Sequence, residues 1–350
     1  MADSRLDDAR RLFSPEGAYL NTATYGLPPR TAFDAMAAAA DDWRHGRTGF
    51  EGWDRSVGAA RASFARLAGV QEDDVAIGAA LSAFAGLVAA ALPAGARVLC
   101  AEEDFTSVLF PFLAQEARGV AVDLVPAERL PEAIGARHDL VAVSAAQSAD
   151  GRVADLDAIA AAAAHHGART FVDTTQALGW LPLDCSRFDY TACSGYKWLL
   201  GPRGTAYFTV RPERRDDLVA HAAGWYAGED VPGSYYGAPL RLARSARRFD
   251  LSPAWLNWVG AAPALALLEE VGVEAVHAHD VGLADRLRAG LGMAPGGSAI
   301  VSVAGLPDDA ADRLRAAGVM AAGRGGGLRL SCHLYTTDRD VDRALEVLAR

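Results

Sequence analysis

Strand-like and helix-like segments alternate along most of this chain, and that alternation restricts its fold more than any other feature. Strand-like runs lie at 73–79, 96–104 and 139–147, and a helical segment rich in Ala or Leu follows each of them. The runs "RTFVDTTQ", "DYTACSGY" and "GTAYFTV" repeat the strand-like pattern further on. Such runs, with few alternating polar residues, are typical of a largely parallel sheet that is covered by helices on both faces. We therefore predict an α/β fold for the larger part of the chain.

The pattern changes near residue 250. Beyond it, "AIVSVAG", "DDAADRLRAAG", "GLRLSCH" and "DRDVDRALEVLAR" indicate a smaller α+β unit. A chain of 350 residues also exceeds what one hydrophobic core usually covers. We expect an N-terminal segment over residues 1–20, a large domain over 21–250 and a small C-terminal domain over 251–350.

Charge and cysteine content narrow the classes of function. The formal net charge is −10 and no lysine-rich run exists, which argues against a nucleic-acid partner or an anionic membrane surface. The first residues are polar and acidic, unlike a signal peptide, and no apolar run free of Gly, Pro and charge has transmembrane length. The four cysteines show neither CxxC nor Cys/His zinc spacing. We expect a cytoplasmic protein without a metal site.

Two isolated charges stand in otherwise apolar sequence: Asp173 closes "TFVD", and Lys197 follows "ACSGY". A buried charge without a partner is costly, so each of them needs a partner or a chemical role. Ligands of doubly wound sheets bind at the carboxyl ends of the strands, and we expect both side chains at that edge. The common fingerprints of nicotinamide enzymes, P-loop proteins, zinc peptidases and serine hydrolases are all missing.

Several motifs resemble one enzyme family. The run "DTTQ" from Asp173 to Gln176, and "SGYKW" from Ser194 with "GPRG" behind it, resemble the cofactor core of class V aminotransferase-type pyridoxal phosphate enzymes. This group includes cysteine desulfurases, kynureninases and isopenicillin N epimerase-like proteins. "YLNTATYGLPP", "EEDFTSVLFPF", "RRFDLSP" and "LRLSCHLYTTDRDVDRALEVL" match the family in its order, so the resemblance covers nearly the whole chain. It implies the fold of type I pyridoxal phosphate enzymes.

The resemblance implies pyridoxal 5′-phosphate as the cofactor. A primary amine has to form a Schiff base with it, and Lys197 matches the family's lysine. Asp173 matches the anion that keeps the pyridine nitrogen protonated and makes the ring an electron sink. From the residues alone, Lys197 could instead be a lysine at the core edge whose head reaches solvent, and Asp173 could be a helix N-cap.

The resemblance also implies contacts around the cofactor. Gln176 would bind its phenolic oxygen, and Gln147 would approach the same oxygen from the next strand end, with Ser148 as the neighbouring candidate. The phosphate would bind at a helix start formed by Leu81 and Ser82, where the family usually has Thr and Glu or Asn. The remaining contacts are stacking by Phe105, phosphate binding by Ser194 and Tyr196, and a contact from Ser252 to the phosphate bound by a partner subunit. The last contact implies a homodimer with shared sites.

On the substrate side, Arg329 matches the family's carboxylate-binding arginine, because a guanidinium pairs with a carboxylate in a bidentate way. Asn21 lies in the N-terminal segment that lines the family's substrate site. An aromatic-lined pocket is suggested by Trp225, Tyr226, Tyr235 and Tyr236. Cysteine desulfurases carry a nucleophilic cysteine in the region that reads "DRLRAAGVMAAGRGGG" here, and this run has none. Cys332 lies beyond the arginine on the strand, so sulfur transfer is disfavoured.

We expect a pyridoxal phosphate enzyme that acts on a small-molecule amino acid, with aminotransfer as the leading reaction, because Lys197 can move a proton between the substrate and the cofactor. The alternatives are β-elimination as a C–S lyase, and then racemisation or epimerisation, because the same carbanion serves all three. A substrate without a carboxylate, such as a nucleotide sugar, is disfavoured by Arg329. The alternative outside enzymes is a degenerate descendant that keeps the fold as a sensor or binding module.

Overall fold

A seven-stranded sheet forms the centre of the computed structural model, which describes residues 2–349. Five of its strands pair in parallel and confirm the largely parallel sheet, while β8 is antiparallel to both of its neighbours. The order across the sheet is β2 (Val75–Gly78), β8 (Ala206–Val210), β7 (Tyr190–Ser194), β6 (Arg169–Asp173), β5 (Leu140–Ser144), β3 (Arg97–Ala101) and β4 (Ala121–Val125).

Helices cover both faces of this sheet. Neighbouring residues of β8 show the two faces, since Phe208 stacks on Phe84 of one layer with ring centroids 5.0 Å apart, and Tyr207 stacks on Phe64 of the other at 4.2 Å. One layer contains α4 (Leu81–Ala91) and α5 (Thr106–Leu113). The opposite layer contains α3 (Phe50–Ala68), α6 (Leu130–Ala133), α7 (Leu156–His166) and α8 (Trp255–Val271).

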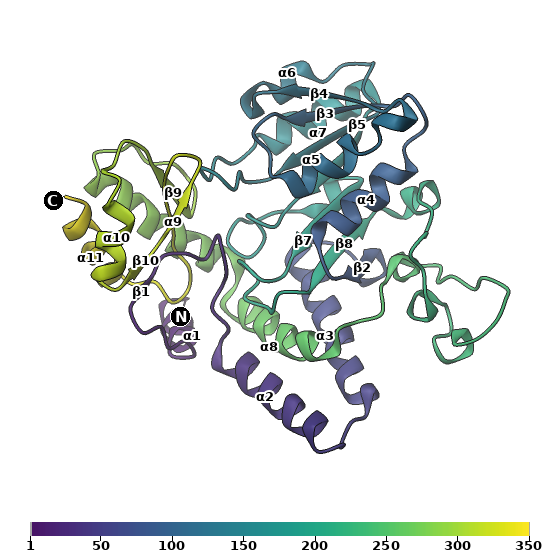
Figure 1. Ribbon diagram of the computed structural model, residues 1–350, viewed down its shortest axis with the longest axis horizontal. Helices are drawn as coiled ribbons and strands as arrows, with labels where there is room; N and C mark the ends of the chain where they lie inside the picture. The colour runs from purple at the N-terminus through teal and green to yellow at the C-terminus, as the bar shows by residue number, and fades with distance from the viewer. Residues whose placement is uncertain (1, 350) are drawn as a thin grey trace.

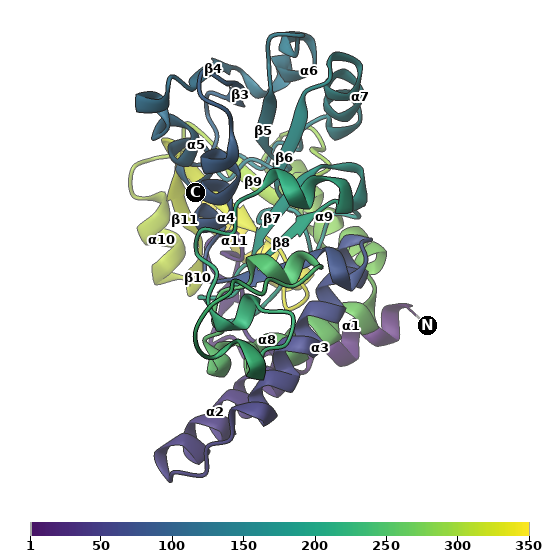
Figure 2. The same ribbon diagram turned by 90° about the vertical axis from the view of Figure 1, so that its right-hand side faces the viewer.

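A smaller unit lies beside the large sheet, at the same side of the molecule as both chain ends (Figure 1). Its antiparallel sheet has the order β11 (Ala322–Arg324), β12 (Gly327–Ser331) and β9 (Ile300–Val303). Its helices are α9 (Val273–Gly290), α10 (Ala310–Ala316) and α11 (Asp338–Leu348). The chain start joins it, because β1 (Ala18–Tyr19) pairs with β10 (Val319–Met320). The N-terminal part also supplies α1 (Ala2–Arg10) and α2 (Arg30–Arg44), and α2 projects away from the body of the molecule (Figure 2).

Helix α8 follows residue 251 and packs on the large unit. It contacts α2 and α3, and its Trp258 contacts Tyr207 of the large sheet at 5.3 Å between ring centroids. The domain boundary near residue 250 stays a prediction. An apolar helix of this kind has no periodicity in the sequence that tells which neighbour it covers.

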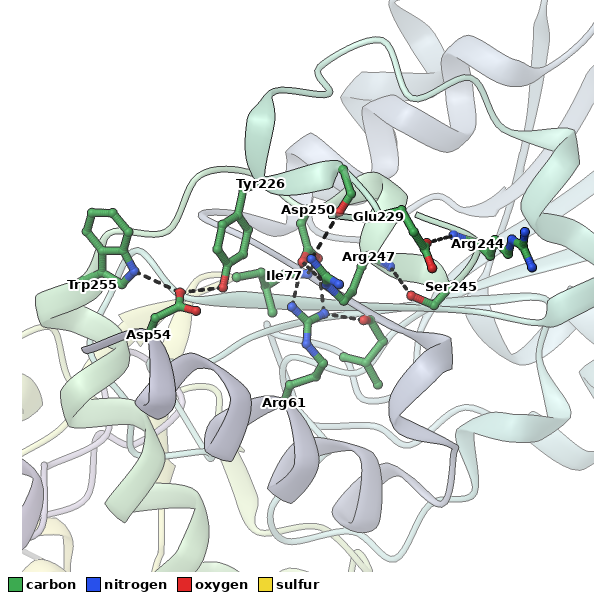
Figure 3. Close-up of polar contacts among 12 residues, drawn as sticks. Asp54, Arg61, Ile77, Tyr226, Glu229, Arg244, Ser245, Arg247, Asp250 and Trp255 are labelled. Carbon is green, nitrogen blue, oxygen red and sulfur yellow. Dashed lines mark hydrogen bonds and ion pairs between the residues drawn. The ribbon is translucent and has the colours of Figure 1, made fainter. Parts of the chain in front are cut away.

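A buried ion pair fixes the segment "RRFDLSP" beside strand β2 (Figure 3). Asp250 accepts a hydrogen bond from Arg61 Nη2 at 2.6 Å and another from the backbone N–H of Ile77 at 2.8 Å. The backbone N–H of Leu251 then donates to the Ile77 carbonyl at 3.1 Å. Asp250 and Arg61 are 0% and 4% exposed, so these hydrogen bonds are needed to offset their lost hydration. The pair sets the path of the chain toward Ser252, which is exposed.

Candidate functional site

One cavity lies at the carboxyl edge of the large sheet, where the sequence predicted a site. Asp173 ends β6, Ser144 ends β5, and Lys197 follows the end of β7. The cavity is lined by Ala79, Ala80, Leu81, Ser82, Phe105, Ser107, Ser144, Ser148, Asp173, Thr175, Gln176, Ser194, Tyr196, Lys197 and Arg203. These lining residues include no histidine, cysteine or glutamate.

Lys197 is almost fully buried, with 7% of its surface exposed, and it is the only lysine of the 350-residue sequence. Its Nζ lies 5.6 Å from the ring centroid of Phe105 and 5.7 Å from that of Tyr196. The pKa of Lys197 is lowered to about 8, mainly by burial and also by the nearby charge of Arg329. Asp173 acts in the opposite direction and raises this pKa. A lysine with this pKa is partly neutral near physiological pH, so its amine can act as a nucleophile or a base.

Two buried carboxylates lie within electrostatic range of each other at this edge of the sheet, and one of them, Asp173, lines the cavity with Lys197. Asp173 Oδ1 accepts a hydrogen bond from the Thr175 N–H at 2.7 Å; burial raises the pKa of Asp173, while Thr175 and Lys197 oppose the rise. Asp104 accepts from the Ser144 N–H at 2.9 Å and from the Ser144 hydroxyl. Burial raises the pKa of Asp104 to about 6. Asp104 and Ser144 were not predicted as site residues from the sequence, because a polar residue beside a strand end is too common to single out.

The two glutamines that were expected near one cofactor oxygen lie apart. Gln176 lines the cavity, but its amide is engaged: Nε2 donates to the Ala23 carbonyl at 3.0 Å and to Ser148 Oγ at 3.1 Å, and Oε1 accepts from Trp198 Nε1 at 2.8 Å. Gln147 does not line the cavity; its buried side chain borders a separate hollow. Ser148, the neighbouring candidate, is the residue that reaches the cavity.

The start of α4 forms a wall with free backbone donors. Its N-cap, Ala80, is extended at φ −155° and ψ 146°, and no side chain caps the helix. The first N–H groups of a helix have no partner within the helix, so an anion can bind there. Leu81 and Ser82 of this turn line the cavity, as do Ser194, Tyr196 and Phe105.

Arg329 is 1% exposed and lies behind Ser148. It donates to the Ser148 carbonyl, to Ser148 Oγ at 3.1 Å and to Thr24 Oγ1 at 2.7 Å, and its Nε has no partner among the described residues. The pKa of Arg329 is lowered to about 10, mainly by burial and also by the positive charge of Arg324. No carboxylate among the side chains that the structure describes forms an ion pair with this guanidinium.

The other expected substrate contacts do not line this cavity. Asn21 forms an isolated β-bridge with Ser331, and its buried Oδ1 has no partner in the described part of the chain. Ser252 is exposed and outside the cavity. Tyr226 donates its hydroxyl to Asp54 at 2.7 Å (Figure 3), and the other members of the expected aromatic pocket also lie outside the cavity: Trp225, Tyr235 and Tyr236.

Residues 55–307 match the family model of aminotransferase class V. The chain belongs to this family. Pyridoxal 5′-phosphate is the cofactor of class V enzymes, and the cavity suits it: it offers a buried amine of lowered pKa, a carboxylate, and an uncapped helix start. Within residues 2–349 no cluster of His, Cys, Asp and Glu suits a metal ion, and no helix is long and apolar enough to cross a membrane.

Known relatives of this class V chain differ in activity. It is 31% identical to the uncharacterized aminotransferase YcbU of Bacillus subtilis, over 83% of this chain and 82% of that protein. It is 28% identical to isopenicillin N epimerase of Streptomyces clavuligerus, over 99% and 98% of the two chains. The structure of the cystine C–S lyase C-DES superposes with a TM-score of 0.87 at 21% identity, covering 95% of this chain and 97% of that one, which shows the shared fold.

Proposed function

We propose that this class V protein is a pyridoxal phosphate-dependent aminotransferase for a small α-amino acid. The observation that carries this proposal is the composition of the cavity: Lys197 is the lining residue with a pKa near 8, and no histidine, cysteine or glutamate accompanies it. Transamination needs one base that moves a proton between two nearby carbon atoms on one side of the cofactor. When bound, the cofactor supplies the electron sink that makes the substrate proton acidic.

Each neighbouring residue has a role in this proposal. Lys197 would hold the cofactor through its amine and would carry the transferred proton at Nζ. Asp173 would supply the negative charge that keeps the pyridine nitrogen protonated. Phe105 would supply an aromatic surface for the ring, since an aromatic side chain can stack but cannot donate a proton. Arg329 binds the substrate carboxylate, which the absence of any carboxylate partner for this buried guanidinium supports.

The cavity is lined by neither a cysteine thiol nor a histidine or glutamate base, which argues against sulfur transfer and against racemisation. All four cysteines are buried, and burial raises the pKa of Cys332 far above its usual range, so none is suited to carry a persulfide. A two-base racemisation would need a proton donor on the face opposite the lysine, and no histidine, cysteine or glutamate lines the cavity to serve as one. β-Elimination remains the second candidate, because Lys197 alone can remove the substrate proton that it requires.

A homodimer with shared sites is part of this proposal. Ser252 is exposed and its segment is held rigidly against β2 by the Asp250–Arg61 pair, so it can face a second subunit without reaching its own cavity. One relative is named an epimerase and another an aminotransferase, so the reaction has to be decided by product analysis.

Product analysis tests the proposal directly. The protein loaded with cofactor is incubated with single L- or D-amino acids, with and without a 2-oxo acid as amino acceptor. The proposal predicts a new amino acid formed from the acceptor, a 2-oxo acid formed from the donor, and no release of ammonia. Pyruvate and ammonia from cysteine or cystine without an acceptor would identify a lyase instead, and inversion of the substrate would identify an epimerase. Lys197→Ala is the control in every assay, because it removes the base but keeps the cavity.

A further inference from the structure

The anion-binding wall at the start of α4 carries little charge of its own. Ala80 provides no cap, Leu81 is apolar, and Ser82 is a neutral donor. A helix N-terminus contributes only about half an elementary charge, whereas a phosphate monoester carries about −1.5 to −2 at pH 7. A phosphate in this cradle would therefore be under-neutralised unless another cation reaches it.

Arg203 is the one guanidinium among the residues that line this cavity. Its Cζ lies 5.0 Å from the ring centroid of Tyr196, which follows Ser194 and Gly195 at the end of β7. Its backbone is held, since its N–H donates to the Tyr25 hydroxyl at 3.1 Å and its carbonyl accepts from Asn257 Nδ2 at 2.9 Å. Its guanidinium forms no ion pair with a carboxylate of the described residues. The backbone is thus fixed while the charged head is free for a ligand.

The other two arginines near the lysine do not line this cavity. Arg329 donates to Ser148 Oγ at 3.1 Å and to Thr24 Oγ1 at 2.7 Å, and Arg324 lies on β11 of the small sheet. Arg203, in contrast, lines the cavity together with Leu81 and Ser82 of the first turn of α4. Of the three arginines, Arg203 is therefore the one that shares a cavity wall with the start of α4.

We propose that Arg203 binds the phosphate of the cofactor, together with the first turn of α4. The cation–π contact with Tyr196 would hold the guanidinium at this wall, where its N–H groups can bind a phosphate in the cradle. The inference depends on the family's cofactor and not on the reaction proposed above, so a lyase or an epimerase would leave it unchanged.

The experiment compares two ligands that differ only in the phosphate: pyridoxal 5′-phosphate and pyridoxal. Their Kd values are measured by absorbance on the full chain freed of cofactor, for wild type and for Arg203→Ala, Arg203→Gln and Arg203→Lys. We expect Arg203→Ala and Arg203→Gln to raise the Kd of pyridoxal phosphate roughly ten- to a hundredfold, the size of a lost charge-assisted contact, and to leave the Kd of pyridoxal within about twofold. Arg203→Lys should recover part of the loss, because an ammonium also binds phosphate.

Arg324→Ala is the matched control, since it removes an unpaired arginine near the lysine and should leave both Kd values unchanged. An equal rise in the Kd values of pyridoxal phosphate and pyridoxal would overturn the proposal and would mean that Arg203 acts by positioning Tyr196. Unchanged Kd values, with a raised KM only for substrates that carry a second acidic group, would also overturn it and assign Arg203 to the substrate. Melting temperatures of the three variants show whether each is folded, and Arg203→Gln keeps the test open if the alanine variant is not.

Discussion

The imidazole of His333 connects Asp280 of helix α9 to the backbone beside Lys197. Its Nδ1 lies 2.9 Å from Asp280 Oδ2, and its Nε2 lies 3.1 Å from the carbonyl oxygen of Trp198, the residue after the lysine. The side chains of His333 and Asp280 are both 0% exposed. These two contacts tie helix α9 of the small unit to the lysine-bearing loop through one buried side chain.

Removing the side-chain oxygens that contact His333 should be costly. We expect Asp280→Ala to lower the free energy of unfolding by about 1–3 kcal/mol or more, because it leaves a buried ring nitrogen without its partner. Denaturant unfolding of the full chain measures it. The control is Asp342→Ala, which breaks an exposed pair with Arg286 and should cost at most about 1 kcal/mol. Equal, small losses for both variants would show that the contact between Asp280 and His333 does not hold the small unit to the loop.

The reactivity of Lys197 should follow its lowered pKa. The neutral amine is the reactive form, and with a pKa of about 8 its fraction falls tenfold per pH unit below 8 and is nearly complete above 9. Trace acetylation of the cofactor-free protein by acetic anhydride, whose reactive form does not change with pH, is read on the peptide that contains Lys197 and should therefore be half-maximal near pH 8. Asp173→Asn should move the midpoint to lower pH, because Asp173 raises this pKa. A midpoint above pH 10 would mean that the amine is solvated.

Arg329 should separate substrate binding from cofactor binding. Replacing it with alanine should raise KM for carboxylated substrates roughly ten- to a hundredfold, equivalent to about 1.5–3 kcal/mol, while the Kd of the cofactor changes little. Arg329→Lys should recover little of the loss, because an ammonium cannot form the bidentate contact. A melting curve serves as the control, since Arg329 also holds Ser148 and Thr24. A lower melting temperature with unchanged KM would make the arginine structural.

The buried thiols should not take part in turnover. Cys332 is 0% exposed and its pKa is raised by burial, so little thiolate forms at neutral pH. Cys332→Ala, which keeps the position apolar, should have wild-type activity, and L-cysteine should yield no persulfide on the protein by mass spectrometry. A loss of activity confined to this variant would return sulfur transfer to consideration.

Continuous apolar runs made most of the large sheet predictable. Strands such as β5 and β6 are buried on both faces, and no other regular structure satisfies a short run of this kind between helices. Strand β4 was not predicted, because it lies at the sheet edge and "AVDLV" is only partly buried there. Asp173 and Lys197 were predicted to share one edge, since parallel strands end together, and both line the cavity.

Side-chain direction after a strand end was not predictable in the same way. Gln147 and Ser148 lie beyond the end of β5, where the alternation of strand side chains no longer applies, and in the structure Ser148 is the one that reaches the cavity. Arg203 lies in the loop of "GPRG", where no periodicity applies and where Tyr25 and Asn257, distant in sequence, set the backbone. The roles of Arg329 and Ser252 stay predictions, because they depend on a substrate and on a second subunit.

Borohydride reduction of the protein in the presence of pyridoxal 5′-phosphate tests the central claim most directly, because Lys197 is the only lysine in the chain. The account predicts a yellow protein whose mass after reduction rises by one phosphopyridoxyl group, located by peptide mapping on Lys197, and no such adduct in Lys197→Ala. Absence of the adduct from Lys197 in a folded wild-type protein saturated with cofactor would contradict it.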